Sequence, residues 1–92
     1  MTAASQAANP HPPADLDGWD LAWSRFVEAS DHTGRTRRWH VLDTGPNDAR
    51  LTVLAIHGNP TWAYIWRHLA AAVPDDVRVI APDQLDMGFS ER

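Results

Sequence analysis

The residues of this chain best suited to chemistry are His57, Gly58, Asn59 and Pro60, which stand at an abrupt change of sequence pattern. An apolar run, residues 51–56, precedes them, and a helical pattern follows at once. Such a junction places backbone N–H groups at the carboxyl end of a buried strand, where open α/β sheets bind ligands. Gly58 allows close backbone approach and positive φ. Asn59 offers a backbone N–H and a side-chain amide, so the turn could hold an oxyanion or a halide ion. The alternative is an ordinary capped turn between a strand and a helix.

Three side chains in or near this turn, those of His57, Trp62 and Trp66, each have two interpretations. His57 could act as a general base, but the neighbouring sequence supplies no nucleophile for it. We therefore interpret His57 as a side chain that orients the loop by hydrogen bonding. Trp66 repeats at helical spacing and is expected in the core, whereas Trp62, in the first helical turn, is a candidate substrate-binding residue.

An acidic cluster follows the last predicted strand and consists of Asp83, Asp86 and Glu91, with Gln84 between them. Oxygen ligands suit hard cations, but the ligand spacing of an EF-hand is absent from the sequence. We expect no metal site and no cofactor. Asp83 is expected to tie down the loop that follows its strand.

The groups that would react are not recognisable in the sequence. No G-x-S-x-G motif occurs, and Ser24, Ser30 and Ser90 have no nucleophile elbow around them. No aspartate stands on a glycine-flanked strand-to-helix turn. Acyl or alkyl transfer needs a nucleophile, a base and a group that orients the base. We therefore predict that nucleophile, base and acid are absent from these residues.

The predicted elements make the opening part of an α/β sheet. Residues 23–27 and 35–42 are expected to form a hairpin around a turn at 31–34. The apolar segments 51–56 and 77–81 are expected as parallel strands buried on both faces. The amphipathic segment between them predicts a helix, for which Asn59 suits the N-cap, Pro60 the first helical position and Pro74 the stop. The fold expected is an antiparallel hairpin followed by a right-handed βαβ unit, and it is incomplete.

Length and composition limit the classes of function. The chain has 92 residues, no cysteine and a formal net charge of −4, and all eight basic residues are arginine. One small domain is the most that this length allows. The cluster of Arg35, Arg37 and Arg38 is too small for a nucleic-acid-binding face, and we interpret it as a solvated strand. No membrane-spanning run and no signal peptide are recognisable, so a cytoplasmic location is expected. Residues 1–18, which are rich in Ala and Pro, are expected to be a disordered leader before a domain at 19–92.

Taken together, three segments resemble a known family. The segment Ile56-His-Gly-Asn-Pro-Thr-Trp62, with Tyr64 and Trp66-Arg67, resembles the oxyanion loop of α/β-hydrolases of the haloalkane dehalogenase-like branch. Ile80-Ala-Pro-Asp83 through Met87-Gly88-Phe-Ser90 resembles the loop after that family's fourth strand, and Trp39-His-Val-Leu-Asp-Thr-Gly45 its second strand. The second-strand segment and Asp83-Gln84-Leu85 look most like the hydrolase half of bacterial olefin-synthesis proteins, which act on β-lactones.

The resemblance implies functions for individual residues. The residue matching Asn59 gives a backbone amide to the oxyanion hole, and in dehalogenases its side chain helps to bind halide. His57, Gly58, Pro60, Asp83 and Gly88 match structural positions of the two loops. The implied nucleophile is an aspartate on an elbow after strand five, beyond residue 92, with a histidine base and an acidic partner further on.

The resemblance allows more than one substrate class and more than one function. The substrate implied is a small haloalkane, ester or β-lactone, and a ligase-like domain or partner is implied for some relatives. Asp86 departs from the family pattern because that position is usually glycine, and positive φ there would suit aspartate less well. The alternative function is a truncated or remnant chain without catalytic activity.

Overall fold

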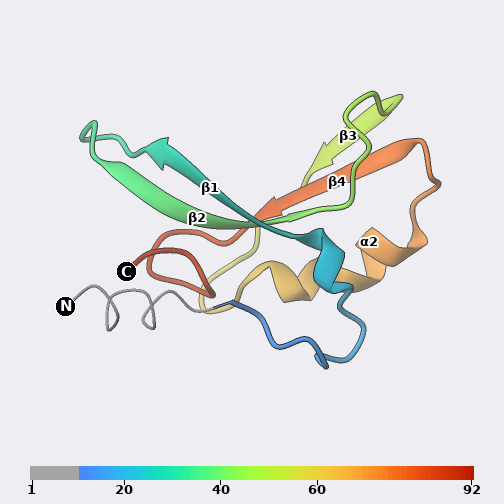
Figure 1. Cartoon of the computed structure of the whole chain (residues 1–92), viewed down its shortest axis with the longest axis horizontal. Helices are drawn as coiled ribbons and strands as arrows, with labels where there is room; N and C mark the ends of the chain where they lie inside the picture. Colours follow the sequence, from blue (N-terminus) through green and yellow to red (C-terminus); the bar gives the residue numbers. More distant parts are fainter. Residues whose placement is uncertain (1–10) are drawn as a thin grey trace.

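The hairpin and the two apolar segments assemble into one mixed sheet with the strand order β1-β2-β4-β3. The computed structural model describes residues 11–92. Figure 1 shows the β1–β2 hairpin and the β3–β4 pair, with α2 beneath the sheet. In chain order the elements are η1 (Leu21–Trp23), β1 (Ser24–Ser30), β2 (Thr36–Asp43), β3 (Leu51–Leu54), η2 (Ala63–Trp66), α2 (Arg67–Ala72) and β4 (Val77–Pro82).

The β1–β2 hairpin forms where the sequence predicts it. β1 pairs antiparallel with β2 from Ser24 opposite Leu42 to Ser30 opposite Thr36. Asp31 organises the turn, because its Oδ1 accepts hydrogen bonds from the N–H and the hydroxyl of Thr33. Asp31 also pairs with the Arg37 guanidinium at 3.1 Å, and Arg37 reaches Glu91 at 3.0 Å on its other side. Arg37 is therefore largely enclosed by ion pairs, and the interpretation of this cluster as a solvated strand was wrong for it.

β3 and β4 confirm the predicted parallel pair, joined through η2 and α2. Leu51 lies opposite Val77, and Leu54 lies opposite Ile80. β2 joins the other edge of β4 in antiparallel sense, which makes the sheet mixed. β3 is thus an edge strand with one partner among the described residues.

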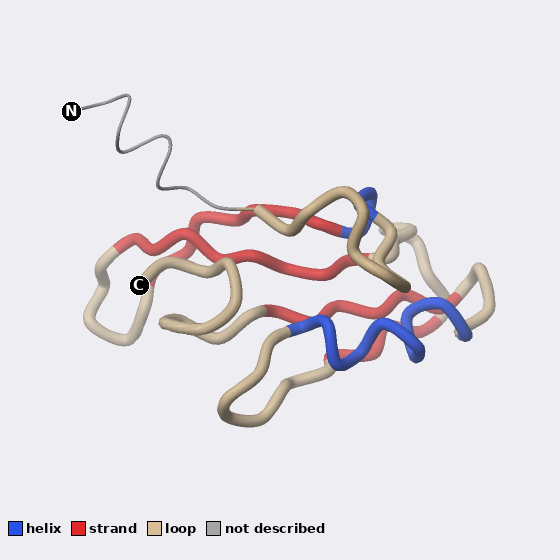
Figure 2. The backbone as a smooth tube through the Cα atoms, turned by 90° about the horizontal axis from the view of Figure 1, so that it is seen from below, coloured by secondary structure: helices blue, strands red, loops and turns tan. Residues whose placement is uncertain are grey.

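The core lies on the α2 face of the sheet. Figure 2 shows the molecule from that side, with the helical segments against the strands. The fully or nearly fully buried apolar residues of the core are Trp19, Leu42, Ala55, Ala63, Ala70, Val79 and Ala81.

The opposite face of the sheet carries apolar side chains without a cover in the described residues. Leu54 retains 65% of its surface and Ile56 retains 53%. The expectation that the strand at 51–56 is buried on both faces was therefore wrong for this chain, since α2 covers one face only. Parallel strands usually need cover on both faces.

Asp43 and Arg78 form an ion pair between β2 and β4. Both carboxylate oxygens of Asp43 accept from the Arg78 guanidinium, at 2.8 and 2.6 Å. The hydrogen bond from Arg78 is the main reason that the pKa of the Asp43 carboxyl lies below its usual value, and the Gly45 N–H also lowers it. Because folding lowers this pKa, the pair stabilises the fold above about pH 4, and that contribution is lost as the pH falls through the folded pKa.

Part of the predicted leader packs against the domain. Residues 1–10 lie outside the described residues. In the segment 11–18, Pro12 is fully buried, and Leu16 packs against the core. The Tyr64 hydroxyl donates to the Asp17 carbonyl oxygen at 2.6 Å. In residues 11–18 these apolar contacts and this hydrogen bond offset the cost of ordering the segment.

No helix within residues 11–92 has the length and apolar character needed to span a membrane.

Candidate functional site

The helix begins later than its sequence pattern predicts. The first helical residue is Ala63, in η2, and regular α-helix begins at Arg67. Asn59 is therefore not the N-cap, and Pro60 is not the first helical position. The Ala63 N–H is instead satisfied from a distant loop, by Asp83 Oδ1 at 2.7 Å. Residues 57–62 are left as an exposed or half-exposed loop at the carboxyl end of β3, apart from the buried His57.

Asp83 is the hub that joins three elements beside this loop. Its side chain has no exposed surface. Its carboxylate accepts hydrogen bonds from the N–H groups of Ala63 and Phe89 and contacts His40 Nδ1 at 2.8 Å. Gly88, at φ +54°, passes so close that an added Cβ would overlap the Asp83 carboxylate. The buried carboxylate is thus fully engaged, as a buried charge requires.

A buried polar network extends from Asp83 into the core. His40 Nε2 lies 3.1 Å from Ser24 Oγ, and that oxygen accepts from the Trp19 indole N–H at 3.1 Å. The order Ser24–His40–Asp83 is that of a Ser-His-Asp catalytic triad. Four aromatic rings surround the His40 imidazole, with ring centroids 5.1–6.3 Å from its own: Phe26, Phe89, Trp19 and Trp62.

This network has the contacts of a structural cluster. His40 has no exposed surface for a substrate to reach. No described backbone donors converge on Ser24 Oγ, which instead accepts from Trp19. His40 carries no signal in the sequence, because a polar residue in a strand normally faces solvent, and only its buried partners reveal otherwise.

The tip of the 57–62 loop presents two free donors. Within the described residues neither the Gly58 N–H nor the Asn59 N–H donates a hydrogen bond, and both residues are exposed. The neighbouring His57 is buried, with 3% of its surface exposed. The Gln84 N–H donates to His57 Nε2 at 2.9 Å, and His57 Nδ1 contacts the Gly58 carbonyl oxygen at 2.6 Å. Both ring nitrogens are therefore occupied, which leaves His57 no free lone pair with which to act as a base.

The structure constrains the residue type differently at three loop positions, Gly58, Gly88 and Asp86. A Cβ on Gly58 would meet nothing within 4 Å, so this chain alone does not require glycine there. Gly88 has no such room. Asp86 adopts φ +70°, the strained conformation that its departure from the family pattern predicts.

The remaining candidates are dispersed. Trp62 is half-buried and stacks on Tyr64 with ring centroids 5.3 Å apart. Trp66 is also half-buried, and its indole nitrogen is enclosed without a hydrogen-bond partner in the described residues. Glu91 lies with Arg37 and the Arg38 N–H, and that backbone hydrogen bond chiefly lowers the pKa of its carboxyl. No group of three possible metal ligands occurs among residues 11–92.

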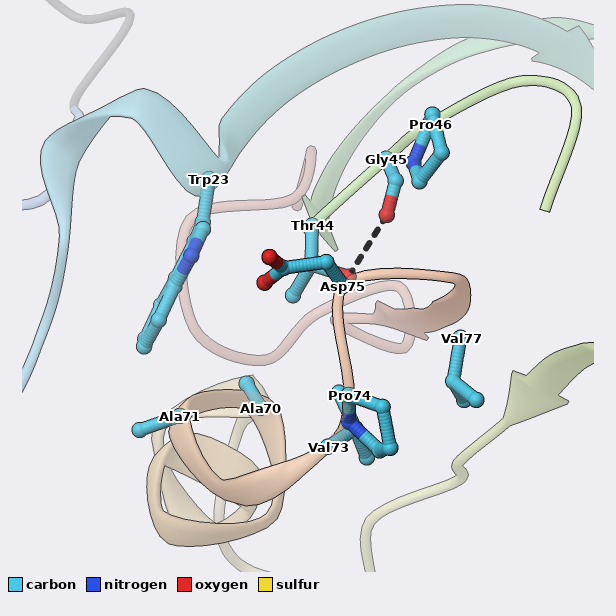
Figure 3. Close-up of a pocket in the computed structure, with 10 residues that line it drawn as sticks. All are labelled: Trp23, Thr44, Gly45, Pro46, Ala70, Ala71, Val73, Pro74, Asp75 and Val77. Atoms are coloured by element: carbon cyan, nitrogen blue, oxygen red, sulfur yellow. Dashed lines mark hydrogen bonds between the residues drawn. The ribbon is translucent and has the colours of Figure 1, made fainter.

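A cleft of about 560 Å³ lies away from this loop. Trp23 faces Ala70 and Ala71 of α2 across it, and Pro46 and Val77 also line it (Figure 3). It lies where β4 begins, whereas Asn59 follows the carboxyl end of β3. The cleft and the donor loop are therefore at opposite ends of the parallel strands.

Comparisons with known proteins match this geometry to one branch of hydrolases. No family model matches the chain. The chain is 47% identical over 51 residues to a cis-3-alkyl-4-alkyloxetan-2-one decarboxylase of Xanthomonas campestris pv. campestris, covering 55% of this chain and 17% of that protein. It is 36% identical over 70 residues to a haloalkane dehalogenase of Mycolicibacterium paratuberculosis, covering 75% and 23%.

The structural comparison points to the same kind of hydrolase. The fold superposes on the haloalkane dehalogenase DpaA of Paraglaciecola agarilytica NO2 with a TM-score of 0.67 and 28% identity, over 88% of this chain and 28% of that one. These likenesses support a haloalkane dehalogenase-like α/β-hydrolase fragment. The chain corresponds to the N-terminal part of this hydrolase fold and spans about a fifth of the curated relatives it matches. The family resemblance and the mixed-sheet fold that the sequence predicts are both confirmed.

Proposed function

We propose that the 57–62 loop supplies the oxyanion or halide donor of an α/β-hydrolase whose reacting groups lie outside these 92 residues. The observation that carries the proposal is the pair of unengaged N–H groups on Gly58 and Asn59 at an exposed tip. Donors held ready where negative charge develops contribute about 10²–10³-fold to a rate. The position at the carboxyl ends of parallel strands also supports a ligand site.

In this proposal a carboxylate nucleophile attacks carbon or acyl carbon, and hydrolysis or elimination follows. The substrate is a small haloalkane, ester or β-lactone. The names of the relatives support the two ends of this range, since one is an oxetan-2-one decarboxylase and another a haloalkane dehalogenase. Trp62, the half-buried last residue of the loop, is proposed as a substrate-binding side chain. The comparisons give no support to a ligase-like partner.

The Asn59 side chain separates the two substrate classes. In a parent protein that carries the nucleophile, Asn59→Ala keeps the backbone N–H but removes the side-chain amide. A hydrogen bond to a charged group contributes about 1.5–3 kcal/mol, so kcat/KM for a haloalkane should fall roughly 10–100-fold. For a lactone, whose oxyanion the backbone serves, we expect a change of less than about threefold.

The matched control is Asn47→Ala, which changes an exposed asparagine in the turn after β2. Both substrates should be turned over at unchanged rates by this variant. Equal and negligible effects of Asn59→Ala on both substrate classes would contradict a side-chain function in halide binding.

A further inference from the structure

We propose that Gln84 is a positioning residue that sets the direction of the two free amides at Gly58 and Asn59. The orientation of the amides is a property of this chain alone. What the amides bind rests on the function proposed above. Two peptide planes set this direction, and each is fixed by a hydrogen bond to its carbonyl oxygen.

The first plane is the peptide between His57 and Gly58. The Gln84 side-chain Nε2 donates to the His57 carbonyl oxygen at 2.7 Å. In a planar trans peptide the C=O of one residue and the N–H of the next point in opposite directions. Holding the His57 carbonyl toward Gln84 therefore directs the Gly58 N–H away from Gln84, to the side where it has no partner in the described residues.

The second plane is the peptide between Gly58 and Asn59. The Gln84 backbone N–H donates to His57 Nε2, which places the ring proton on Nδ1. Nδ1 then donates to the Gly58 carbonyl oxygen at 2.6 Å. By the same planar geometry the Asn59 N–H points away from the imidazole ring. One residue, Gln84, thus controls the first plane directly and the second through His57.

Hydrogen bonds of the preceding residue, Asp83, hold the backbone at Gln84 in place. The preceding Asp83 N–H donates to the His40 carbonyl oxygen at 2.8 Å, and the Asp83 carboxylate accepts from Ala63 and Phe89. The loop is consequently fastened at His57 and at Ala63 by two consecutive residues after β4. Between these two contacts the loop makes one side-chain hydrogen bond among residues 11–92, from His57 Nδ1 to the Gly58 carbonyl oxygen, so the two planes are the means by which its amides are oriented.

The test is Gln84→Leu, which keeps the backbone N–H and removes only the side-chain donor. Nitrogen relaxation and hydrogen exchange of the labelled chain report the order of each amide, and a sodium bromide titration at constant ionic strength reports anion binding. We expect the Gly58 amide to lose order, Asn59 to change less, and Ala63 to stay protected. Bromide affinity at these two amides should fall roughly fivefold, which corresponds to a loss of about 1 kcal/mol. The control Asn47→Ala should change neither readout.

Each other outcome decides a separate point. Unchanged order at Gly58 in Gln84→Leu overturns the proposal. An equal loss of order at Gly58, Ala63 and Phe89 in the relaxation data also overturns it, because Gln84 would then be a general structural residue. If the unsubstituted chain shows no bromide response but Gly58 still loosens in the variant, the positioning function stands and the proposed anion function fails.

Discussion

Gly88→Ala is expected to destabilise the folded chain by about 3–5 kcal/mol, because overpacking and positive-φ strain act at one position. The added Cβ would overlap the Asp83 carboxylate and lie 2.7 Å from Trp62 Cβ. Asp83 cannot move aside, since its carboxylate is held by Ala63, Phe89 and His40. Breaking this hub would detach the helix start from the sheet, and the loss is a large part of the stability of a small domain.

Urea unfolding followed by tryptophan fluorescence measures this effect, since Trp62 lies at the hub. Gly58→Ala is the matched control, because its Cβ meets nothing within 4 Å. We expect the control to change the free energy of unfolding by less than about 0.5 kcal/mol. Similar losses in both variants would show that the tight contact at Gly88 does not determine stability.

Leu54→Lys is expected to convert a self-associating chain into a monomer at micromolar concentration. β3 pairs only with β4, so its other edge presents unpaired backbone groups, and Leu54 is 65% exposed. An apolar edge of this kind is a template for association, and a lysine on it is the usual protection. The apparent association constant should fall at least about tenfold.

Leu21→Lys is the control for this change. Leu21 is 46% exposed in η1, away from β3, and the substitution alters the net charge by the same amount. Both variants make the net charge of the chain less negative. This weakens the repulsion between chains, so the change in charge alone would favour association. Sedimentation velocity distinguishes the three proteins. A monodisperse unsubstituted chain with strongly protected amides along Leu51–Leu54 would refute the idea of an open edge.

The sequence predicts the sheet well because its signals are local. The turn at 31–34 and the two apolar runs locate the four strands to within a few residues. The helix start is different. Asn59 and Pro60 have the residue types of a helix N-terminus, yet the helix begins at Ala63. Asp83, twenty residues later, accepts the hydrogen bond from the Ala63 N–H at this helix start. A capping acceptor that comes from a distant loop leaves no local sequence pattern at the helix start.

The site shows the same division. The exposed loop around Asn59 follows from the strand-to-helix junction, but the contacts that orient it come from Gln84, which the sequence places only between acidic residues. His40 could not be predicted either, since its burial depends on Ser24 and Asp83 arriving from two other segments. Contacts between segments, rather than residue types, decide both.

The central claim is that this chain provides a donor loop and that the reaction needs groups from outside it. The Ser24–His40–Asp83 cluster is the one arrangement in residues 11–92 that could act instead, since its connectivity is that of a triad. The cluster is structural, because aromatic rings enclose His40 and the Ser24 hydroxyl accepts from Trp19.

The most direct test is turnover of a haloalkane, an aryl ester and a β-lactone by the purified 92-residue chain, with fluorophosphonate labelling read out at Ser24. We predict no turnover above buffer and no label on Ser24, because a donor loop cannot replace a nucleophile and base. Turnover that Ser24→Ala abolishes, accompanied by a labelled Ser24 in the unsubstituted chain, would contradict the account.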